Sequence, residues 1–342
     1  MRQVVTYEPR RLAIQSVPAL QAGPGEVVVE VQAVGICGSD LHIFNGTHAY
    51  LCFPVVQGHE IAGRLRSVGA GVAHRRTGEM VTVEPTVPCG ECFACRRGRD
   101  NACARLQVLG VHRPGGFADE VLVGADRVHA VGDLDPELAV LCEPVAVALQ
   151  AVERAGVEAG DHVVVIGGGS IGRAISMVAA DQGAEVLIAD REPARLRLAE
   201  RLGAQRAVNT TTEDLMAAIQ DFTHGDGARI VLEATGVPAV IAATLDLVAP
   251  TGTVVIVGVS GEQVCLPVGI FTRKELTVLG SRNSTAKFPL AVDVVRRHRS
   301  VLQEFVSHRF PLEQAAEAIR LATDHAELVS KAILIPTGAG RP

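Results

Sequence analysis

The sequence predicts an α/β protein of two domains, one rich in β-strands and one built on a doubly wound parallel sheet. Its 342 residues are enough for two hydrophobic cores. Short Val/Ile runs punctuated by Gly and Pro, such as residues 26–31, fill the first part and are typical of strands. Beyond Glu143 and Pro144, strand-like runs alternate with helical ones. That alternation implies a parallel sheet covered by helices on both faces.

The elements of the second domain follow from this alternation. A helix is expected at 147–156, and another at 169–182 after a glycine turn. Strands are expected at 163–166, 186–189, 230–232, 253–257 and 276–279. The tail holds an amphipathic segment, 312–321, and a strand-like run, 331–335, which we expect to return to the first domain.

The composition is that of a globular protein, with 48% hydrophobic and 20% charged residues. A net charge of −6 argues against nucleic acid or an anionic membrane as the main partner. The basic run 296–299 is interpreted as a solvated helix face. The N-terminus lacks an apolar signal core, and no apolar stretch reaches membrane-spanning length. We therefore expect a cytoplasmic protein that binds neither nucleic acid nor membrane.

Cys89, Cys92, Cys95 and Cys103 lie within fifteen residues, at the spacing C-x2-C-x2-C-x7-C. A loop this short can fold four thiolates around one tetrahedral ion, each sulfur about 2.3 Å from the metal. A closed shell of four sulfurs leaves no position for a reactant, so we predict a structural zinc site. Disulfides are the alternative, but the other four cysteines are scattered and no secretory signal precedes them.

A glycine-rich turn links an expected strand to an expected helix, with Gly167, Gly169 and Gly172 in the pattern G-x-G-x-x-G. The first glycine permits the tight turn, the second lets the backbone approach a pyrophosphate, and the third lets helix and strand pack closely. Ser170 and Ile171 lie at the helix N-terminus, which presents N–H groups to the phosphates. The sequence therefore predicts a dinucleotide site.

The next expected strand ends in Asp190, eighteen residues after Gly172. A carboxylate there can accept hydrogen bonds from both adenosine ribose hydroxyls. It would repel a 2′-phosphate, which favours NAD over NADP. Arg191, directly after it, could instead partner a phosphate, so NADP stays open. Arg195 is expected either to stack on the adenine or to be a solvated helix residue.

Further metal-type ligands occur near the N-terminus. Cys37 and His59, with a carboxylate, would make a mixed shell of three protein ligands that leaves a position for water or substrate. Glu60 and Glu143 are the carboxylate candidates, and the choice between them stays open. Asp40 is expected to accept the ring N–H of His59 and fix its tautomer. We predict a second, catalytic zinc here.

Together these motifs resemble the zinc-dependent medium-chain alcohol and polyol dehydrogenases over nearly the whole chain. The segment Gly58-His59-Glu60, the cysteine lobe and the nucleotide turn follow that family's order. The resemblance implies a GroES-like catalytic domain of residues 1–145 and 283–342, and a Rossmann coenzyme domain of residues 146–282. The dipeptide Glu143-Pro144 resembles the corresponding segment of sorbitol-type polyol dehydrogenases.

The resemblance also implies roles for single residues. Val257 is expected at the coenzyme. Arg282 either holds a substrate carboxylate or the nicotinamide end of the cofactor, or braces its loop. Cys142 is interpreted as a core residue, and whether it or Glu143 approaches the metal stays open. Cys52 and Cys265 have no other metal-type ligands beside them and are expected to be packing residues.

The implied reaction is oxidation of a secondary hydroxyl by hydride transfer to NAD. Ionising such a hydroxyl at pH 7 costs on the order of 12 kcal/mol if its pKa is near that of water, and zinc lowers that cost. Ser39, two residues after Cys37, suits the first relay hydroxyl, and by resemblance His42 passes the proton towards solvent. A local turn hydrogen bond for Ser39 and a plain surface position for His42 are the alternatives.

The substrate is less closely defined. With 9 Phe, 2 Tyr and no Trp, the chain is poorly equipped to line a pocket for a bulky apolar alcohol. Segments 108–117, 272–275 and 280–284 resemble the sugar-acid and polyol dehydrogenases of the L-galactonate 5-dehydrogenase type. Sorbitol, xylitol or threonine are alternative substrates, and a non-catalytic NAD-binding protein of the same fold is the alternative from another class. Relatives imply a homodimer or homotetramer.

Overall fold

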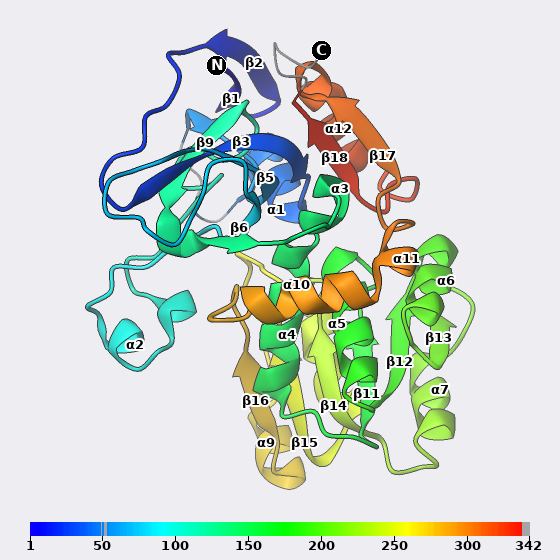
Figure 1. The fold of residues 1–342 in the computed structure, drawn as a ribbon. Coiled ribbons are helices and arrows are strands. Elements are labelled where there is room, and N and C mark those ends of the chain that lie inside the picture. Colours follow the sequence, from blue (N-terminus) through cyan, green and yellow to red (C-terminus); the bar gives the residue numbers. More distant parts are fainter. Residues whose placement is uncertain (49, 51–52, 337–342) are drawn as a thin grey trace. The chain divides into compact units, whose positions relative to one another are not determined.

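The computed structural model describes residues 1–48, 50 and 53–336. It divides into two units, residues 1–143 with 288–342 and residues 144–287 (Figure 1). The expected limits at 145/146 and 282/283 lie two and five residues from these divisions. Residues after 282 stay with the second unit because the Thr285 N–H donates to Gln150 (3.2 Å) and Lys287 pairs with Glu153 (2.7 Å).

The first unit is rich in β-strands, as predicted, and its strands pair antiparallel except for the parallel pair of β17 and β18. Its main sheet has the order β10-β6-β5-β3-β18-β17, with β9 also paired to β3; β2-β1-β4 and β7-β8 form two smaller sheets. The strands are β1 (Arg2–Glu8), β2 (Arg11–Ser16), β3 (Glu26–Gly35), β4 (Val55–Val56), β5 (Glu60–Val68), β6 (Met80–Val83), β7 (Thr86–Val87), β8 (Gln107–Val108), β9 (Glu120–Gly124), β10 (Val128–Ala130), β17 (His308–Pro311) and β18 (Ala332–Ile335).

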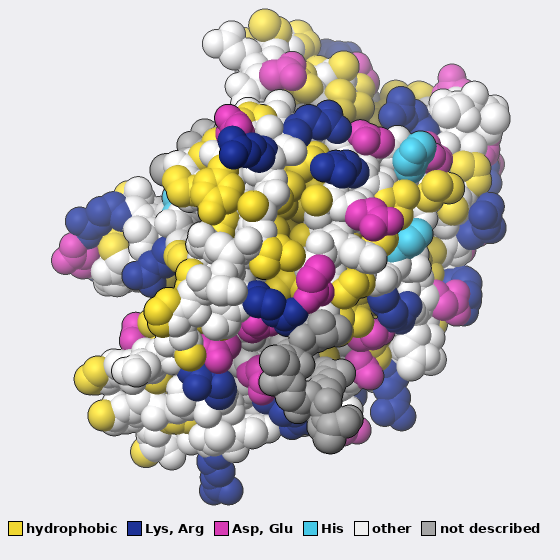
Figure 2. Space-filling view, turned by 90° about the horizontal axis from the view of Figure 1, so that it is seen from above, with side chains coloured by type: hydrophobic (Ala, Val, Ile, Leu, Met, Phe, Trp, Pro, Cys, Tyr) yellow, Lys and Arg dark blue, Asp and Glu magenta, His cyan; other side chains and the backbone are white. Residues whose placement is uncertain are grey.

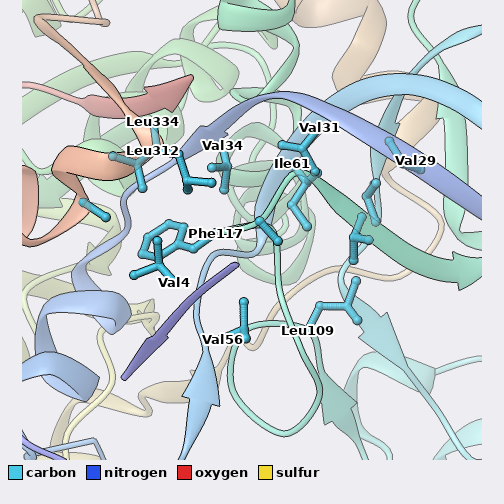
Figure 3. Close-up of a cluster of buried hydrophobic side chains, with 14 of the residues drawn as sticks. Val4, Val29, Val31, Val34, Val56, Ile61, Leu109, Phe117, Leu312 and Leu334 are labelled. Carbon is cyan, nitrogen blue, oxygen red and sulfur yellow. The ribbon is translucent and has the colours of Figure 1, made fainter. Parts of the chain in front are cut away.

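The core of this unit lies between the sheets. Figure 3 shows the Phe117 ring beside Val4, with Val34 and Ile61 nearby. Phe117 is 0% exposed, and alternate residues of β3 supply the valines around it because side chains of a strand alternate between its two faces. The core therefore fixes the register of β3 and β5, the two strands that adjoin the predicted catalytic metal ligands.

Helices of the first unit are short, apart from those near its ends. They are α1 (Gly38–Asn45), α2 (Phe93–Arg96), α3 (Pro136–Ala139), α10 (Phe288–Arg297), α11 (Arg299–Leu302) and α12 (Ala315–Asp324). The amphipathic segment expected at 312–321 is divided, with a 3-10 turn at Leu312–Gln314 before α12. The basic run 296–299 spans the end of α10 and the start of α11, and its three arginines are exposed as expected.

The tail returns to the first unit, which confirms that prediction. Strand β18 pairs antiparallel with β3, placing Ile333 opposite Gly35 and Leu334 opposite Val34. The backbone N–H of Ile36 donates to Ala332 O at 2.9 Å. The C-terminal strand therefore lies directly beside the segment that leads into Cys37.

The second unit contains the predicted doubly wound sheet. All six strands are parallel, in the order β13-β12-β11-β14-β15-β16. Residues 163–165 of β11 are 0% exposed, as expected for a central strand buried on both faces. The strands are β11 (His162–Ile166), β12 (Glu185–Asp190), β13 (Arg206–Asn209), β14 (Ala228–Glu233), β15 (Val248–Ile256) and β16 (Thr277–Gly280).

Helices flank this sheet (Figure 1). They are α5 (Ser170–Asp181), α6 (Pro193–Arg201), α7 (Leu215–Phe222), α8 (Pro238–Leu247) and α9 (Val268–Lys274), preceded by α4 (Cys142–Ala155). Helix α4 begins five residues before the expected position 147. Pro144 is compatible with this earlier start because the N–H groups of a helix's first turn have no intrahelical partner.

The face shown in Figure 2 carries acidic and basic side chains interspersed with one another. In the part of the chain that the structure describes, no helix is both long and apolar enough to cross a membrane.

Candidate active site

The four-cysteine lobe is the cyan loop around α2 in Figure 1. Cys89 Sγ lies 4.0 Å from Cys95 Sγ, and Cys92 Sγ lies 3.5 Å from it. A disulfide would bring two sulfurs to roughly 2.05 Å, whereas two sulfurs on one tetrahedral zinc are roughly 3.8 Å apart. With Cys103, the four ligand atoms lie within 4.8 Å of one another. All four cysteines are free in the structure, and this donor set fits zinc.

Arg105 places a positive charge beside this lobe. Its guanidinium pairs with Glu91 and donates a hydrogen bond to Cys89. That bond, with backbone N–H donors, lowers the pKa of Cys89 to about 5. Burial and a hydrogen bond with Cys92 raise the pKa of Cys95 to about 12. The metal-free lobe thus holds thiolate and thiol together, and a bound zinc would displace the remaining protons.

A second cluster unites the two N-terminal ligand segments. Ligand atoms of Cys37, His59 and Glu60 lie within 4.8 Å of one another. Cys37 is the N-cap of α1, just after β3, and Glu60 begins β5. Because β3 and β5 pair with Gly35 opposite Glu60, the segments at their ends come together.

Gly58 delivers His59 to this cluster. Its φ is +91°, a conformation that L side chains rarely adopt, and a Cβ there would lie 2.5 Å from the Phe117 ring. Only glycine therefore lets the chain turn this closely over the core. His59 follows with 7% of its surface exposed.

The His59 ring is buried with one nitrogen unsatisfied. Its Nδ1 has no hydrogen-bond partner among the residues that the structure describes. Burial opposes a positive charge on the ring, but Cys37, followed by the charges of Asp40 and Glu143, raises the pKa of His59 well above its usual range. The site thus stabilises a cation, and thiolate, imidazole and carboxylate together fit zinc.

Asp40 does not bind the His59 ring, contrary to expectation. Its Oδ2 accepts the Cys37 N–H at 2.9 Å, and its Oδ1 accepts the Gly58 N–H at 3.2 Å and Gln57 Nε2 at 3.3 Å. The prediction was wrong because Asp40 is the third residue of α1, where a carboxylate caps the helix N-terminus.

The two candidate carboxylates differ in their surroundings. Lys331 Nζ donates to both oxygens of Glu60, at 2.7 and 2.8 Å. Glu143 lies in the first turn of α4, is 7% exposed, and is absent from the 4.8 Å ligand cluster found among the described residues. Burial is the main cause that raises the pKa of Glu143 to about 7, and the charge of Glu60 adds to it.

Ser39 and His42 are three residues apart on α1, so they lie on one helix face. Ser39 is half-buried and His42 is exposed. His42 Nδ1 lies 3.1 Å from the Thr47 hydroxyl, which is also exposed. Of these side chains, His42 and Thr47 are in hydrogen-bond contact with each other.

The glycine turn joins β11 to α5. Gly167 has a φ of +103°, and a Cβ at Gly172 would lie 1.7 Å from Gly167 O. A Cβ at Gly169 would meet no atom within 4 Å, so open space adjoins the backbone there. Ser170 and Ile171 form the first turn of α5. The turn is thus closely packed on one side and accessible on the other, as a dinucleotide cradle requires.

Asp190 ends β12 beside this turn. Its Oδ2 accepts the Gly168 N–H at 2.5 Å, and its Oδ1 accepts the Glu192 N–H at 2.8 Å. Arg195 NH1 lies 3.9 Å from the same carboxylate. A second basic side chain, Arg173, is 1% exposed, and burial followed by the charge of Arg195 lowers its pKa to about 9.

Comparison with known proteins identifies the family. Residues 23–133 match the model of the alcohol dehydrogenase GroES-like domain, and residues 170–297 match that of the zinc-binding dehydrogenase. The L-galactonate-5-dehydrogenase of Escherichia coli K12 is 33% identical over 319 residues, 93% of this chain and 94% of that protein. The chain belongs to the zinc-type alcohol dehydrogenases.

Other members of the family agree with this assignment. The D-altritol 5-dehydrogenase of Agrobacterium fabrum is 33% identical over 321 residues, 92% of this chain and 94% of that protein. The crystal structure of an Escherichia coli CFT073 alcohol dehydrogenase with NADH has a TM-score of 0.91 and 31% identity, covering 98% of this chain and 99% of that one. The predicted family, fold class and enzyme class, acting on CH–OH donors, are confirmed.

In this dehydrogenase, Val257 directly follows β15, and its N–H donates to Glu233 O at 2.8 Å. Arg282 follows β16, two residues after its end. Lys274 lies in segment 272–275, one of the three that resemble sugar-acid and polyol dehydrogenases. Its Nζ donates to three carbonyls at the end of α8, those of Leu245, Asp246 and Val248, at 2.9, 3.0 and 2.8 Å. These contacts give Lys274 a structural role.

The two described cysteines outside the ligand clusters differ in their exposure to solvent. Cys142 is 0% exposed, as expected of a core residue. Cys265 is exposed, so the expectation that it packs was wrong; it lies in the loop between β15 and α9. Cys52 lies outside the described residues.

Sequence reasoning did not identify Lys331, Thr47 or Arg173. Lys331 precedes the apolar residues of β18, and Arg173 interrupts the apolar run of α5. A lone charged residue inside or beside a buried element was the available signal, because such a residue requires a partner. The identity of each partner depends on contacts that are distant in sequence.

Proposed function

We propose that the chain is a zinc- and NAD-dependent dehydrogenase that oxidises a secondary hydroxyl of a sugar acid or polyol to a ketone. The observation that carries this proposal is the convergence of Cys37, His59 and Glu60 within 4.8 Å around an unsatisfied His59 nitrogen. A dinucleotide-type glycine turn in the other unit supplies the second half of the chemistry. A non-catalytic NAD-binding protein would have no need for that ligand set.

We propose that Cys37, His59 and Glu60 hold the catalytic zinc, with Glu143 as the nearby second carboxylate, and that the four lobe cysteines hold a structural zinc. A catalytic zinc acts as a Lewis acid that lowers the pKa of a hydroxyl group, as it lowers that of water to about 7. NAD supplies the hydride acceptor. The family assignment to zinc-binding dehydrogenases supports both cofactors.

The residues of α1 carry the proton in this proposal. Ser39 accepts the proton that the substrate hydroxyl loses, and His42, one helical turn on, accepts it from Ser39. Thr47, 3.1 Å from His42 Nδ1, is positioned to pass it to water. The reaction balances as secondary alcohol plus NAD⁺ giving ketone, NADH and one proton.

For the coenzyme, we propose that Gly167, Gly169, Ser170, Ile171 and Gly172 receive the pyrophosphate. Asp190 faces the adenosine ribose, and its negative charge favours NAD over NADP. This preference rests on the Asp190 carboxylate, since solved relatives have been crystallised with NADH and with NADP. We further propose that Arg195 lies beside the adenine, and Val257 and Arg282 beside the nicotinamide half.

For the substrate, we propose a sugar acid of the L-galactonate type. Two relatives that match over more than nine-tenths of the chain are named for L-galactonate and D-altritol. The second name keeps a neutral polyol as the alternative. Purified chain supplied with NAD and each of L-galactonate, D-altritol, sorbitol, xylitol and threonine would show the preference as NADH formation. Absence of turnover with every hydroxylated substrate would contradict the proposal.

We also propose a homodimer or homotetramer. The outermost strand β16 has a neighbour on one side only within the described sheet, and unpaired strand edges favour pairing with another chain. Val259 and Val268 are 75% and 77% exposed, which supports a covered surface on this unit. Light scattering of the purified protein would give the mass.

A further inference from the structure

Helix α5 contains a buried arginine in a stretch that is otherwise uncharged. Residues 172–179 of this helix are all buried, and Arg173 is the one charged residue among them. The residue is 1% exposed. Burying a charge costs free energy, and an apolar side chain would fill the same space without that cost. Packing alone therefore does not explain an arginine at this position.

The position is also electrostatically unfavourable for a cation. Arg173 lies in the first turn of α5, at the positive end of the helix dipole. Burial and the charge of Arg195 lower the pKa of the Arg173 guanidinium to about 9, against the attraction of Asp190. The protein thus holds this positive charge at a cost in stability. An anion bound at the same end of the helix would offset that cost.

Arg173 binds the peptide group with which α5 begins. Its backbone N–H and its Nε both donate to the carbonyl oxygen of Gly169, at 3.1 and 3.3 Å. The side chain can reach back to this oxygen because side chains in a helix lean toward its N-terminus. The carbonyl and the N–H of one trans peptide point in opposite directions, so the Ser170 N–H is directed away from Arg173. It is one of the donors that the helix N-terminus presents.

This contact affects the strength of the Ser170 N–H as well as its direction. A cation that donates to a carbonyl oxygen polarises the peptide, because hydrogen bonds in a chain strengthen one another. Open space adjoins the turn at Gly169, where a Cβ would meet no atom within 4 Å. An anion in that space would therefore meet a fixed, strengthened N–H donor with a positive charge behind it.

We propose that Arg173 is a positioning residue for the coenzyme, which fixes the Gly169–Ser170 peptide and strengthens its N–H for the pyrophosphate. The inference rests on the proposed coenzyme site and adds to it a residue outside the G-x-G-x-x-G pattern. Because Arg173 is buried, it acts from behind the turn and does not touch the coenzyme.

The test separates the charge of Arg173 from its hydrogen bond. Arg173→Gln keeps an N–H donor and removes the charge, Arg173→Lys keeps the charge, and Arg173→Met removes both. Calorimetry measures Kd for ADP-ribose, which contains the pyrophosphate, and for adenosine, which does not. The methionine variant should bind ADP-ribose about tenfold more weakly than wild type, a modest effect for a charge acting over a few ångströms of protein. The lysine variant should stay close to wild type, and the glutamine variant should lie between the two.

Arg197→Met is the matched control, because it removes the same charge from an exposed position on α6. It should bind both ligands as wild type does, since solvent and salt screen an exposed charge. Adenosine affinity should be unchanged in every variant. If Arg173→Met does not fold, the glutamine and lysine variants carry the test. Wild-type affinity for ADP-ribose in a folded Arg173→Gln variant would overturn the inference. Equal weakening of adenosine and ADP-ribose would overturn it too, since Arg173 would then merely support the structure.

Coenzyme binding by wild type separates this inference from the proposed function. A wild-type chain that binds neither NAD nor ADP-ribose contradicts the coenzyme site itself. A wild-type chain that binds both, and whose Arg173→Gln variant binds them equally well, contradicts only the role of Arg173.

Discussion

Asp40 accepts a hydrogen bond from the backbone N–H of Gly58, 3.2 Å away, and so fixes the segment that carries His59. Its other carboxylate oxygen accepts the N–H of Cys37 at 2.9 Å. One buried carboxylate therefore ties together the two segments whose side chains form the metal cluster. It orders these ligands through their backbone rather than through the imidazole.

Asp40→Ala should weaken the catalytic metal site without affecting the lobe. Loss of both backbone contacts frees the two ligand segments, so the affinity for the catalytic zinc should fall about 10- to 100-fold. Asp40→Asn keeps one oxygen acceptor and should fall between the alanine variant and wild type. Competition with a zinc-binding dye measures both affinities. Equal zinc affinity in Asp40→Ala and wild type would show that the backbone contacts do not order the site.

Cys37→Ala should abolish turnover while NAD binding is unchanged. The thiolate is a direct ligand in the proposed site, whereas the glycine turn belongs to the other unit. Cys265→Ala is the matched control, because Cys265 is exposed and outside both ligand clusters. Turnover and NAD titration by fluorescence check the two outcomes. A Cys37→Ala enzyme with normal turnover would refute the assignment of this ligand.

Cys92→Ser should lower stability more than intrinsic rate. The lobe has few apolar contacts of its own: in its helix α2 no residue is buried, so bound zinc must supply much of its folding free energy. We expect the melting temperature to fall by at least about 3 °C, the shift that a loss of about 2 kcal/mol gives in a chain this size. The Cys265→Ser variant should melt like wild type. Scanning calorimetry measures the difference, and an unchanged melting temperature would contradict a structural zinc.

Much of the fold could be predicted because it rests on local pattern. The residues of β11 form a continuous apolar run, as a strand buried on both faces must. The glycine spacing placed the turn before α5 correctly. The start of α4 was placed too late, because Pro144 resembles a helix boundary although the first turn tolerates it.

The site was less predictable where two interactions compete for one group. Asp40 has a carboxylate that could pair with an imidazole, but its position in α1 makes it a helix cap. Glu60 has a carboxylate that could bind a metal, but its pairing with Lys331 depends on a strand 271 residues away in sequence. The local spacing of residues does not indicate either of these competing interactions. The four lobe cysteines, whose spacing alone brings them together, were the simplest to predict.

Asp190→Ala should reduce the preference for NAD. The carboxylate would no longer repel a 2′-phosphate, and Arg195, now 3.9 Å from it, would be available to a phosphate. The ratio of kcat/KM for NAD to that for NADP should fall at least about tenfold, equivalent to about 1.4 kcal/mol. Initial rates with both coenzymes measure it. A ratio equal to that of wild type would refute the ribose contact.

The affinity of the metal-free protein for its catalytic zinc should fall as pH is lowered through neutrality. The pKa of Glu143 is raised to about 7, mainly by burial, and the pKa of His59 is raised by its anionic neighbours despite burial. A zinc ion bound by His59 must displace the proton on that ring, and its charge favours loss of the proton from Glu143 nearby. Affinity should rise about tenfold per pH unit for each displaced proton. Glu143→Gln should remove about one proton from the slope; a pH-independent affinity would contradict this account.

The most direct measurement is the zinc content of the folded chain by native mass spectrometry, alongside its dehydrogenase activity. Two zinc ions in wild type, with one lost and activity abolished in Cys37→Ala, is the predicted result. Full activity in a chain that carries zinc only in the cysteine lobe would contradict the catalytic metal at Cys37, His59 and Glu60.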